Sequence, residues 1–154
     1  KDSDSNIEKL VDIGFVGQPT KVNTNFIKEH IKDGNIPVIA PLGVDDEGNS
    51  YNINADTAAG FIAGELKASK LLLLTDVAGL LDQDKKLISS LTLDDASKII
   101  DEDFIVGGMK PKILTCVEAM KKGVNKTTIL DGRIPHSVVL ELFTEHGIGT
   151  QIYS

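Results

Sequence analysis

Residues 51–75, Y-N-I-N-A-D-T-A-A-G-F-I-A-G-E-L-K-A-S-K-L-L-L-L-T, contain the pattern that decides the fold. After Asp56 the apolar residues recur at spacings of three and four as far as Leu66, which predicts an amphipathic helix. The leucine run at 70–75 then matches a strand that is buried on both faces of a parallel sheet. A helix followed directly by such a strand predicts an α/β fold.

The rest of the chain continues this alternation of helices and strands. Asn23 is placed to cap a helix that runs to about Lys32. Residues 36–40 are mostly apolar and predict a buried strand. The alternation predicts a layered α/β fold with a largely parallel sheet. The other expected elements are hairpins at 11–22 and 44–53, helices at 93–100, 111–123 and 137–145, and strands at 126–130 and 150–154.

The overall composition limits the classes of partner. Sixteen basic and 23 acidic residues among 154 give a net charge of −7, which argues against nucleic acid or an anionic membrane as the main partner. The longest apolar run is too short to cross a bilayer. Cys116 is the only cysteine, so no internal disulfide can form and a cytoplasmic location is expected. We interpret Cys116 as a core residue rather than a nucleophile. The three histidines, His30, His136 and His146, are expected to be surface or structural residues.

Asn52, Asn54 and Asp56 form the first of two polar segments that could carry chemistry. One such side chain is enough to cap the helix that follows, and a cap with a turn is the simplest explanation of the segment. That explanation does not account for all three residues. They also stand where a strand is expected to meet the amino terminus of a helix, which is where open α/β sheets bind ligands.

Residues 105–113, I-V-G-G-M-K-P-K-I, form the second segment. A glycine turn and a helix started by Pro111, with lysines in solvent, would account for it. Alternatively, its backbone N–H groups and either Lys110 or Lys112 form a site for phosphate oxygens at the positive end of the helix. The two commonest phosphate-loop motifs are absent from the sequence. In an α/β chain, the two segments together predict a site that handles phosphate.

The motifs N-I-N-A-D (52–56), L-L-L-L-T-D-V-A-G-L-L (71–81) and G-G-M-K-P-K (107–112) resemble the C-terminal portion of the acetylglutamate kinase family, within the amino acid kinase superfamily. The match extends over essentially the whole chain. The resemblance implies a three-layer αβα sandwich around a mainly parallel, eight-stranded sheet, incomplete here because N-terminal strands are missing. It also implies that residues 1–69 are the remainder of an acetylglutamate-binding domain and residues 70–154 an ATP-binding domain.

The resemblance further implies an activity and a set of roles. The activity is phosphorylation of the side-chain carboxylate of N-acetyl-L-glutamate by ATP with Mg²⁺, in arginine biosynthesis. Asn52 resembles the residue that binds acetylglutamate, Asp56 the carboxylate that organises the active-site lysines, and Lys112 the transition-state lysine. Glu141 and Gly147 resemble contacts for arginine as a feedback ligand. The residues that resemble the nucleotide-binding segments are Asp76, Val77, Ala78, Gly79, Leu80, Leu81, Phe104, Ile105 and Val106.

Two departures from the family pattern affect these expectations. Lys110 occupies a position where we expect an apolar residue. The family's first-strand lysine, glycine loops and substrate-binding arginine are not recognisable, so this chain alone is expected to have little or no kinase activity and at most weak nucleotide binding. Open sheet edges would favour self-association, and a homo-oligomer is expected. A non-catalytic nucleotide-binding or assembly fragment, or another amino acid kinase, stays as an alternative.

Overall fold

The computed structural model describes residues 14–105, 107–145 and 147–154. Helices and strands alternate along most of this part of the chain, as the sequence predicts. The elements in chain order are α1 (Thr24–Lys32), β1 (Leu42–Val44), β2 (Ser50–Asn52), α2 (Ala55–Leu66), β3 (Lys70–Thr75), β4 (Ser90–Thr92), α3 (Leu93–Ile99), α4 (Met109–Lys121), β5 (Lys126–Asp131), α5 (Ser137–Phe143) and β6 (Thr150–Tyr153).

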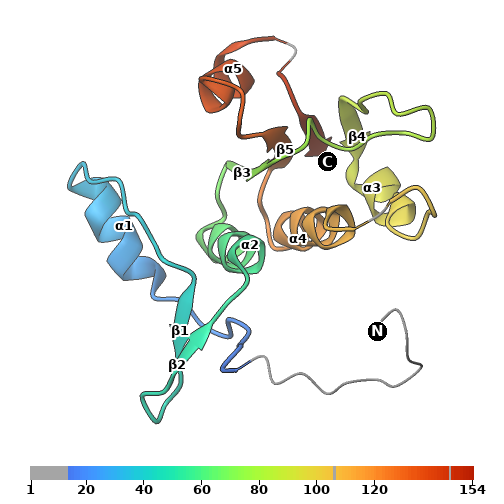
Figure 1. Ribbon diagram of the computed structural model, residues 1–154. Helices are drawn as coiled ribbons and strands as arrows, with labels where there is room; N and C mark the ends of the chain where they lie inside the picture. Colours follow the sequence, from blue (N-terminus) through green and yellow to red (C-terminus); the bar gives the residue numbers. More distant parts are fainter. Residues whose placement is uncertain (1–13, 106, 146) are drawn as a thin grey trace, which may run out of the picture.

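The main sheet has the strand order β3-β5-β6-β4, and the pairs β3–β5 and β6–β4 are parallel while β5–β6 is antiparallel. Helices α2, α4 and α3 cover one face of this sheet and α5 lies on the other (Figure 1). The predicted α/β sandwich with a mainly parallel sheet is confirmed. In the described residues the main sheet has four strands, and β1 and β2 form a separate hairpin, so fewer strands are present than the eight that the resemblance implies.

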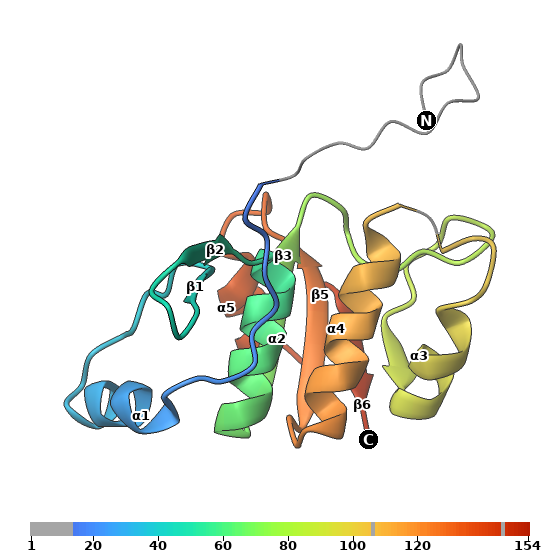
Figure 2. The same ribbon diagram turned by 90° about the horizontal axis from the view of Figure 1, so that it is seen from below.

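The hydrophobic core lies between α4 and the main sheet. Ile113, Cys116 and Val117 on α4 are almost completely buried, and they belong to one cluster with Ile129 of β5 and Ile152 of β6. Their spacing of three and four residues turns one apolar stripe of the helix toward the sheet. Figure 2 shows α4 in front of the sheet, between α2 and α3. The best-buried part of the molecule is therefore the layer that supports the predicted phosphate site.

Short polar caps start the helices where the sequence predicts them. The Asn23 side chain accepts a hydrogen bond from the Phe26 amide at the start of α1. Thr92 accepts from the Asp95 amide at the start of α3. The expected helices after Asp56 and around Pro111 are α2 and α4, whereas the last predicted helix ends at Phe143, two residues early.

Three strand predictions are wrong, wholly or in part. Residues 36–40 form no strand in the described structure, and the side chain of Val38 is 96% exposed. The described part of the first predicted hairpin, residues 14–22, makes only one parallel bridge, between Val16 and Asn52. β3 forms as predicted but lies at the edge of the sheet, so Leu74 is 48% exposed instead of buried. Strand β4 was not predicted.

Candidate functional site

Asn52, Asn54 and Asp56 occupy different positions at the junction between β2 and α2. Ile53, buried between them, fixes the chain at this point. The Asn54 side chain is the helix cap, because its Oδ1 accepts from the Thr57 amide at 3.1 Å. Asn52 is exposed at the end of β2, and its backbone pairs with the segment around Phe15. Asp56 lies in the first turn of α2, free of the capping role.

Asp56 and Lys112 form an ion pair although they are 56 residues apart in the chain. The Lys112 Nζ lies 2.7 Å from the Asp56 Oδ2, and the two side chains are only 18% and 23% exposed. Each residue stands in the first turn of its helix, α2 or α4. A carboxylate is favoured at a helix amino terminus and an ammonium is not, so Asp56 compensates the unfavourable position of Lys112.

Lys110 has a different environment from Lys112. Its Nζ lies 3.1 Å from the Asp101 Oδ1, and both side chains are well exposed, at 52% and 86%. The pair is therefore a surface ion pair outside the Asp56–Lys112 contact. Lys110, which stands where an apolar residue was expected, therefore does not compete with Lys112 for Asp56.

A cavity of about 470 Å³ opens beside Lys112, between the end of β3 and the start of α4. Most of the predicted nucleotide-binding residues line it. Ala78 is not among the lining residues, and Val106 lies outside the described residues. Asn52 and Asp56 do not line it either, so Lys112 is the residue that joins the ion pair to the cavity. The predicted residues that line it are Asp76, Val77, Gly79, Leu80, Leu81, Phe104 and Ile105.

The loop that follows β3 is held in place by Thr150 of β6. The Thr150 Oγ1 accepts a hydrogen bond of 2.8 Å from the Leu80 amide, and both residues are buried. Gly79 has a φ of +147°, and a Cβ at this position would lie 2.6 Å from the same hydroxyl. Only glycine fits there. Gly79 is therefore required at this point of the cavity wall because any side chain there would clash with Thr150.

Glu141 and Gly147, the two predicted arginine contacts, are in direct contact with each other. A Cβ on Gly147 would lie 2.5 Å from a carboxylate oxygen of Glu141. Glu141 is buried, and its carboxylate accepts from the Thr128 hydroxyl at 3.1 Å and from the Ile148 amide at 2.9 Å. In the part of the chain that the structure describes, no lysine or arginine forms an ion pair with Glu141.

Cys116 lies one turn after Lys112 on α4 and is completely buried. The pKa of its thiol is raised from 9.0 to about 11, chiefly by burial and also by the nearby Asp56 carboxylate, whereas Thr127 and the Lys112 ammonium act to lower it. The thiol is therefore protonated near neutral pH and cannot act as a nucleophile. This supports its interpretation as a core residue.

Asp131 and Arg133, at the carboxyl end of β5, were not singled out from the sequence. The Arg133 guanidinium donates two hydrogen bonds to Asp131, at 2.9 and 2.8 Å, and its backbone N–H donates a third. These contacts lower the pKa of Asp131 from 3.8 to about 2. The pKa of Arg133 is raised chiefly by Asp131 and to a smaller extent by Asp76, so the three charges lie near one another. The motif D-G-R directly after an apolar strand was the available signal.

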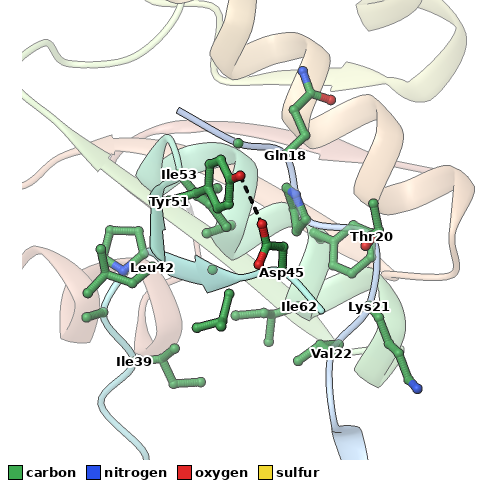
Figure 3. Close-up of a pocket in the computed structure, with 18 residues that line it drawn as sticks. Gln18, Thr20, Lys21, Val22, Ile39, Leu42, Asp45, Tyr51, Ile53 and Ile62 are labelled. Carbon is green, nitrogen blue, oxygen red and sulfur yellow. Dashed lines mark hydrogen bonds between the residues drawn. The ribbon is translucent and has the colours of Figure 1, made fainter. Parts of the chain in front are cut away.

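A second cavity, of about 400 Å³, lies under the β1–β2 hairpin (Figure 3). Its labelled apolar residues come from three separate parts of the chain, and the Tyr51 hydroxyl donates to Asp45 at its rim. None of the predicted substrate, nucleotide or catalytic residues lines it. This cavity is thus distinct from the one beside Lys112. The structure describes no helix long and apolar enough to cross a membrane among residues 14–105, 107–145 and 147–154.

Comparison with protein sequences identifies relatives of the chain. The model of the amino acid kinase family matches residues 2–131. The chain is 55% identical over 152 residues to an acetylglutamate kinase of Afipia carboxidovorans, and equally to that of Gluconobacter oxydans. Each match covers 99% of this chain and 52% of the relative, whose C-terminal portion is the matched part. The chain thus spans about half the length of the curated relatives it matches.

Solved structures give the same picture of the fold. An N-acetylglutamate synthase from Neisseria gonorrhoeae, complexed with coenzyme A and L-arginine, superposes with a TM-score of 0.86 at 31% identity, over 93% of this chain and 33% of that chain. A carbamate kinase from Giardia lamblia bound to AMP-PNP superposes with a TM-score of 0.68 at 18% identity, over 90% of this chain and 46% of that chain. By its sequence and its fold, the chain belongs to the amino acid kinase family.

Proposed function

We propose that this chain takes part in the ATP-dependent phosphorylation of the side-chain carboxylate of N-acetyl-L-glutamate, the acetylglutamate kinase reaction of arginine biosynthesis. One observation carries the proposal: Lys112 lines the cavity after β3 and is held by Asp56 at 2.7 Å. The 55% identity to curated acetylglutamate kinases supports the choice of substrate.

The proposed roles of Lys112 and Asp56 follow from the charges of the reaction. A phosphoryl group in transfer carries negative charge on its equatorial oxygens, so catalysis is mostly positioning and electrostatic stabilisation. The Lys112 ammonium supplies positive charge at the edge of the cavity, and Asp56 fixes its position. Neither residue has to move a proton, because the attacking carboxylate of acetylglutamate is ionised near neutral pH. In this proposal Asn52 contacts acetylglutamate from the end of β2.

The cavity after β3 is the proposed nucleotide site. The surface that lines it is mostly apolar, although polar residues such as Asp82 and Gln83 also line it, and this suits a purine base with a few polar contacts. Among the described residues, no three or more His, Cys, Asp or Glu side chains gather as metal ligands. Mg²⁺ would arrive with ATP and would supply positive charge that partly neutralises the phosphate oxygens.

We further propose that residues 1–69 belong to the acetylglutamate-binding side of the enzyme and residues 70–154 to the ATP-binding side. Because the chain spans about half of its relatives, the phosphoryl group would meet only some of its protein contacts here. The chain alone is then expected to bind MgATP weakly and to turn over little or no acetylglutamate.

A coupled assay of ADP release with MgATP and acetylglutamate tests this proposal, together with calorimetric titration of the nucleotide. Nucleotide binding without turnover is the expected result for the chain alone. Turnover at a rate typical of kinases would contradict the expected inactivity. Failure to bind MgATP or MgADP at millimolar concentration would contradict the nucleotide site. Turnover with carbamate, aspartate, glutamate or UMP, and none with acetylglutamate, would instead support the alternative that the chain comes from another amino acid kinase.

The half-length match also favours a second candidate function, a non-catalytic nucleotide-binding or assembly fragment. The two functions differ when the missing part is supplied. An acetylglutamate kinase fragment gains turnover when it is joined to the remaining part of a relative, and Lys112→Ala removes that turnover. An assembly fragment binds nucleotide in both states and gains no activity.

We propose in addition that Glu141 and Gly147 belong to a site for free arginine. A buried carboxylate is stabilised by a cation, and the described lysines and arginines leave Glu141 without one. The related N-acetylglutamate synthase is described as complexed with L-arginine. Millimolar arginine should raise the melting temperature of the chain and citrulline should not, because citrulline lacks the positive charge. No shift with arginine, or an equal shift in the Glu141→Gln variant, would contradict the site.

The remaining properties of the whole enzyme are proposed from composition and resemblance. The single buried cysteine suits a cytoplasmic protein. The net charge of −7 does not suit nucleic acid or an anionic membrane as a partner. We propose a homo-oligomer for the complete enzyme, and light scattering on it at several concentrations tests this.

A further inference from the structure

The cavity after β3 is lined by two lysines, and the proposed reaction uses only one of them. Lys112 is held by Asp56, with its Nζ 2.7 Å from the Asp56 Oδ2. Lys85, in the loop between β3 and β4, lines the same cavity. It forms no ion pair with any carboxylate in the described part of the chain. An exposed lysine is usually only solvated, so the surroundings of Lys85 decide whether it has a use.

A tight turn fixes the backbone of Lys85. The Asp82 carboxylate accepts hydrogen bonds from the Asp84 and Lys86 amides, at 2.9 and 2.8 Å. The backbone closes the same turn, because the Asp82 amide donates to the Lys86 carbonyl and the Lys85 amide donates to the Asp82 carbonyl. Lys85 therefore stands at the tip of a short hairpin whose conformation is determined by its own residues.

The base of this hairpin is fastened to the main sheet. Leu81 and Leu87 form an antiparallel bridge. The Leu80 amide donates to the Thr150 hydroxyl on β6 at 2.8 Å, and the Leu80 carbonyl accepts from the Ile88 amide, also at 2.8 Å. The loop between β3 and β4 lies at the same end of the sheet as the start of α4 (Figure 2). A hairpin held at its tip and its base presents a side chain to the cavity with little loss of entropy on binding.

The backbone conformation of Lys85 is unfavourable for a lysine. Its φ is +62°, in the left-handed region that glycine adopts most readily. The turn itself gains nothing from the lysine side chain, because its hydrogen bonds use only backbone groups of Lys85 and Lys86. Backbone strain of this kind is concentrated at functional sites. The use of the side chain therefore lies outside the turn, in the cavity that it lines.

We propose that Lys85 is a second cation of the nucleotide cavity and contacts the phosphate oxygens of the nucleotide. This inference rests on the proposed nucleotide site. The other charged residues that line the cavity are Asp76, Asp82 and Lys112, so the lining has no excess of positive charge without Lys85. Lys112 is already paired with Asp56. The ammonium of Lys85 has no such pairing, and its charge is available for a charge-assisted hydrogen bond to phosphate.

Titration of the chain with MgADP, followed by NMR through the backbone amide resonances, tests the contact. Lys85→Ala should weaken binding by about fivefold or more, because a charge-assisted contact is lost. Lys86→Ala is the matched control. It changes the net charge equally and lies in the same turn, but Lys86 does not line the cavity, so the dissociation constant should change by less than about twofold. Raising the NaCl concentration from about 50 mM to about 500 mM should reduce the difference between wild type and Lys85→Ala, because salt screens the contact.

Two outcomes of this titration separate the inference from the proposed function. If wild type binds MgADP and Lys85→Ala binds it equally well, the contact of Lys85 is overturned and the nucleotide site stands. If wild type binds no MgADP at millimolar concentration, the nucleotide site and the contact are both overturned. An equal loss of affinity in Lys85→Ala and Lys86→Ala also overturns the inference, because net charge would then account for it.

Two further variants separate the contact from an effect on folding. Lys85→Gly removes the ammonium and relieves the backbone strain, so it should raise the melting temperature by about 2 °C or more while weakening MgADP binding as much as Lys85→Ala does. Lys85→Arg keeps a positive charge and should bind MgADP within about threefold of wild type. MgADP binding by Lys85→Gly as tight as that of wild type would overturn the inference. An equal loss of affinity in Lys85→Arg and Lys85→Ala would overturn it too, because affinity would then not follow the charge.

Discussion

Two lysines of the same helix turn have separate partners, and this separates their expected effects. Lys112 is paired with Asp56 and lines the cavity, whereas Lys110 is paired with the exposed Asp101. Lys112→Ala should weaken binding of MgATP by about tenfold, because a charge-assisted contact to phosphate is lost. Lys110→Ala is the matched control and should change the dissociation constant by less than about twofold. Isothermal titration calorimetry measures both.

If Lys110→Ala weakened MgATP binding more than Lys112→Ala, the nucleotide phosphates would lie nearer Lys110 and Asp101. Asp56→Asn supplies a further check, because it removes the negative partner and keeps the size of the side chain. With Asp56 neutral, Lys112 loses its fixed position, so MgATP binding should weaken while the melting temperature falls only slightly.

The Asp131–Arg133 pair predicts a pH dependence of stability. The pKa of Asp131 is lowered to about 2 in the folded chain, from 3.8. The unfolded chain therefore binds more protons in this range, and the contribution of the pair, fully present above about pH 4, is lost as the pH falls toward 2. Arg133→Gln removes the cause of the shift. Urea unfolding of both proteins should show a difference at pH 5 that disappears near pH 2.

Asp131→Asn completes this experiment, since it removes the titrating group. On the Asp131→Asn background, Arg133→Gln should give the same small change in stability at every pH. A difference between wild type and Arg133→Gln that stays constant from pH 5 to pH 2 would show that the pair does not set the pKa.

At the scale of elements, two buried threonines have opposite hydrogen-bonding states. The Thr150 hydroxyl on β6 accepts from the Leu80 amide at 2.8 Å. The Thr127 hydroxyl on β5 is buried and forms no hydrogen bond of ordinary geometry with the described residues. It lowers the pKa of the Cys116 thiol, but a thiol is a weak hydrogen-bonding partner. Thr150→Val should therefore lower the free energy of unfolding by about 1–3 kcal/mol, because it leaves a buried N–H group unpaired.

Thr127→Val is the matched control for this prediction. The change keeps the shape of the side chain and removes a buried hydroxyl, so stability should stay the same or rise. Chemical denaturation measures both variants. If Thr150→Val and Thr127→Val lower the free energy of unfolding equally, the hydrogen bond from the Leu80 amide does not hold the loop after β3 against β6.

The helices and the hairpin at 44–53 could be predicted from the sequence because their signals are local. Asn23, Asn54 and Thr92 each satisfy an amide three residues away, so the cap and its partner lie in one short window. In the hairpin, Asp45 accepts from the Glu47 and Asn49 amides. Such interactions do not depend on the rest of the fold, and the sequence alone shows them.

Strands depend on neighbours, and there prediction failed. Residues 36–40 have the composition of a buried strand, but a strand forms only where another strand satisfies its backbone groups. β4 was missed for the converse reason, since its three residues owe their conformation to pairing with β6. In the candidate site, the motifs located Asp56 and Lys112. They gave no sign of Thr150, because its hydrogen bond with Leu80 joins residues 70 positions apart. Arg133 contacts Asp131 only two residues away, so its signal was local and was overlooked.

For the whole molecule, residues 36–44 predict a large exposed apolar surface, since Ile36 is 90% exposed, Val38 96% and Val44 71%. The dye ANS, which fluoresces on such surfaces, should bind the folded chain. The double variant Ile36→Asp/Val38→Asp should reduce this fluorescence by about half or more without lowering the melting temperature, because both side chains are exposed. Phe143→Asp, at an 81% exposed site on α5, is the comparison and should have the smaller effect. Equal reductions would show that the dye does not prefer the apolar surface at residues 36–44.

Asp56 and Lys112 are 56 residues apart in the chain, so the ion pair between them can form only late in synthesis. During synthesis α2 leaves the ribosome first, and its carboxylate has no ammonium to hold until the start of α4 follows 56 residues later. At typical rates of translation this delay lasts about several seconds. A nascent chain therefore carries no prematurely assembled charge pair, and the contact itself reports that both helices have docked on the sheet.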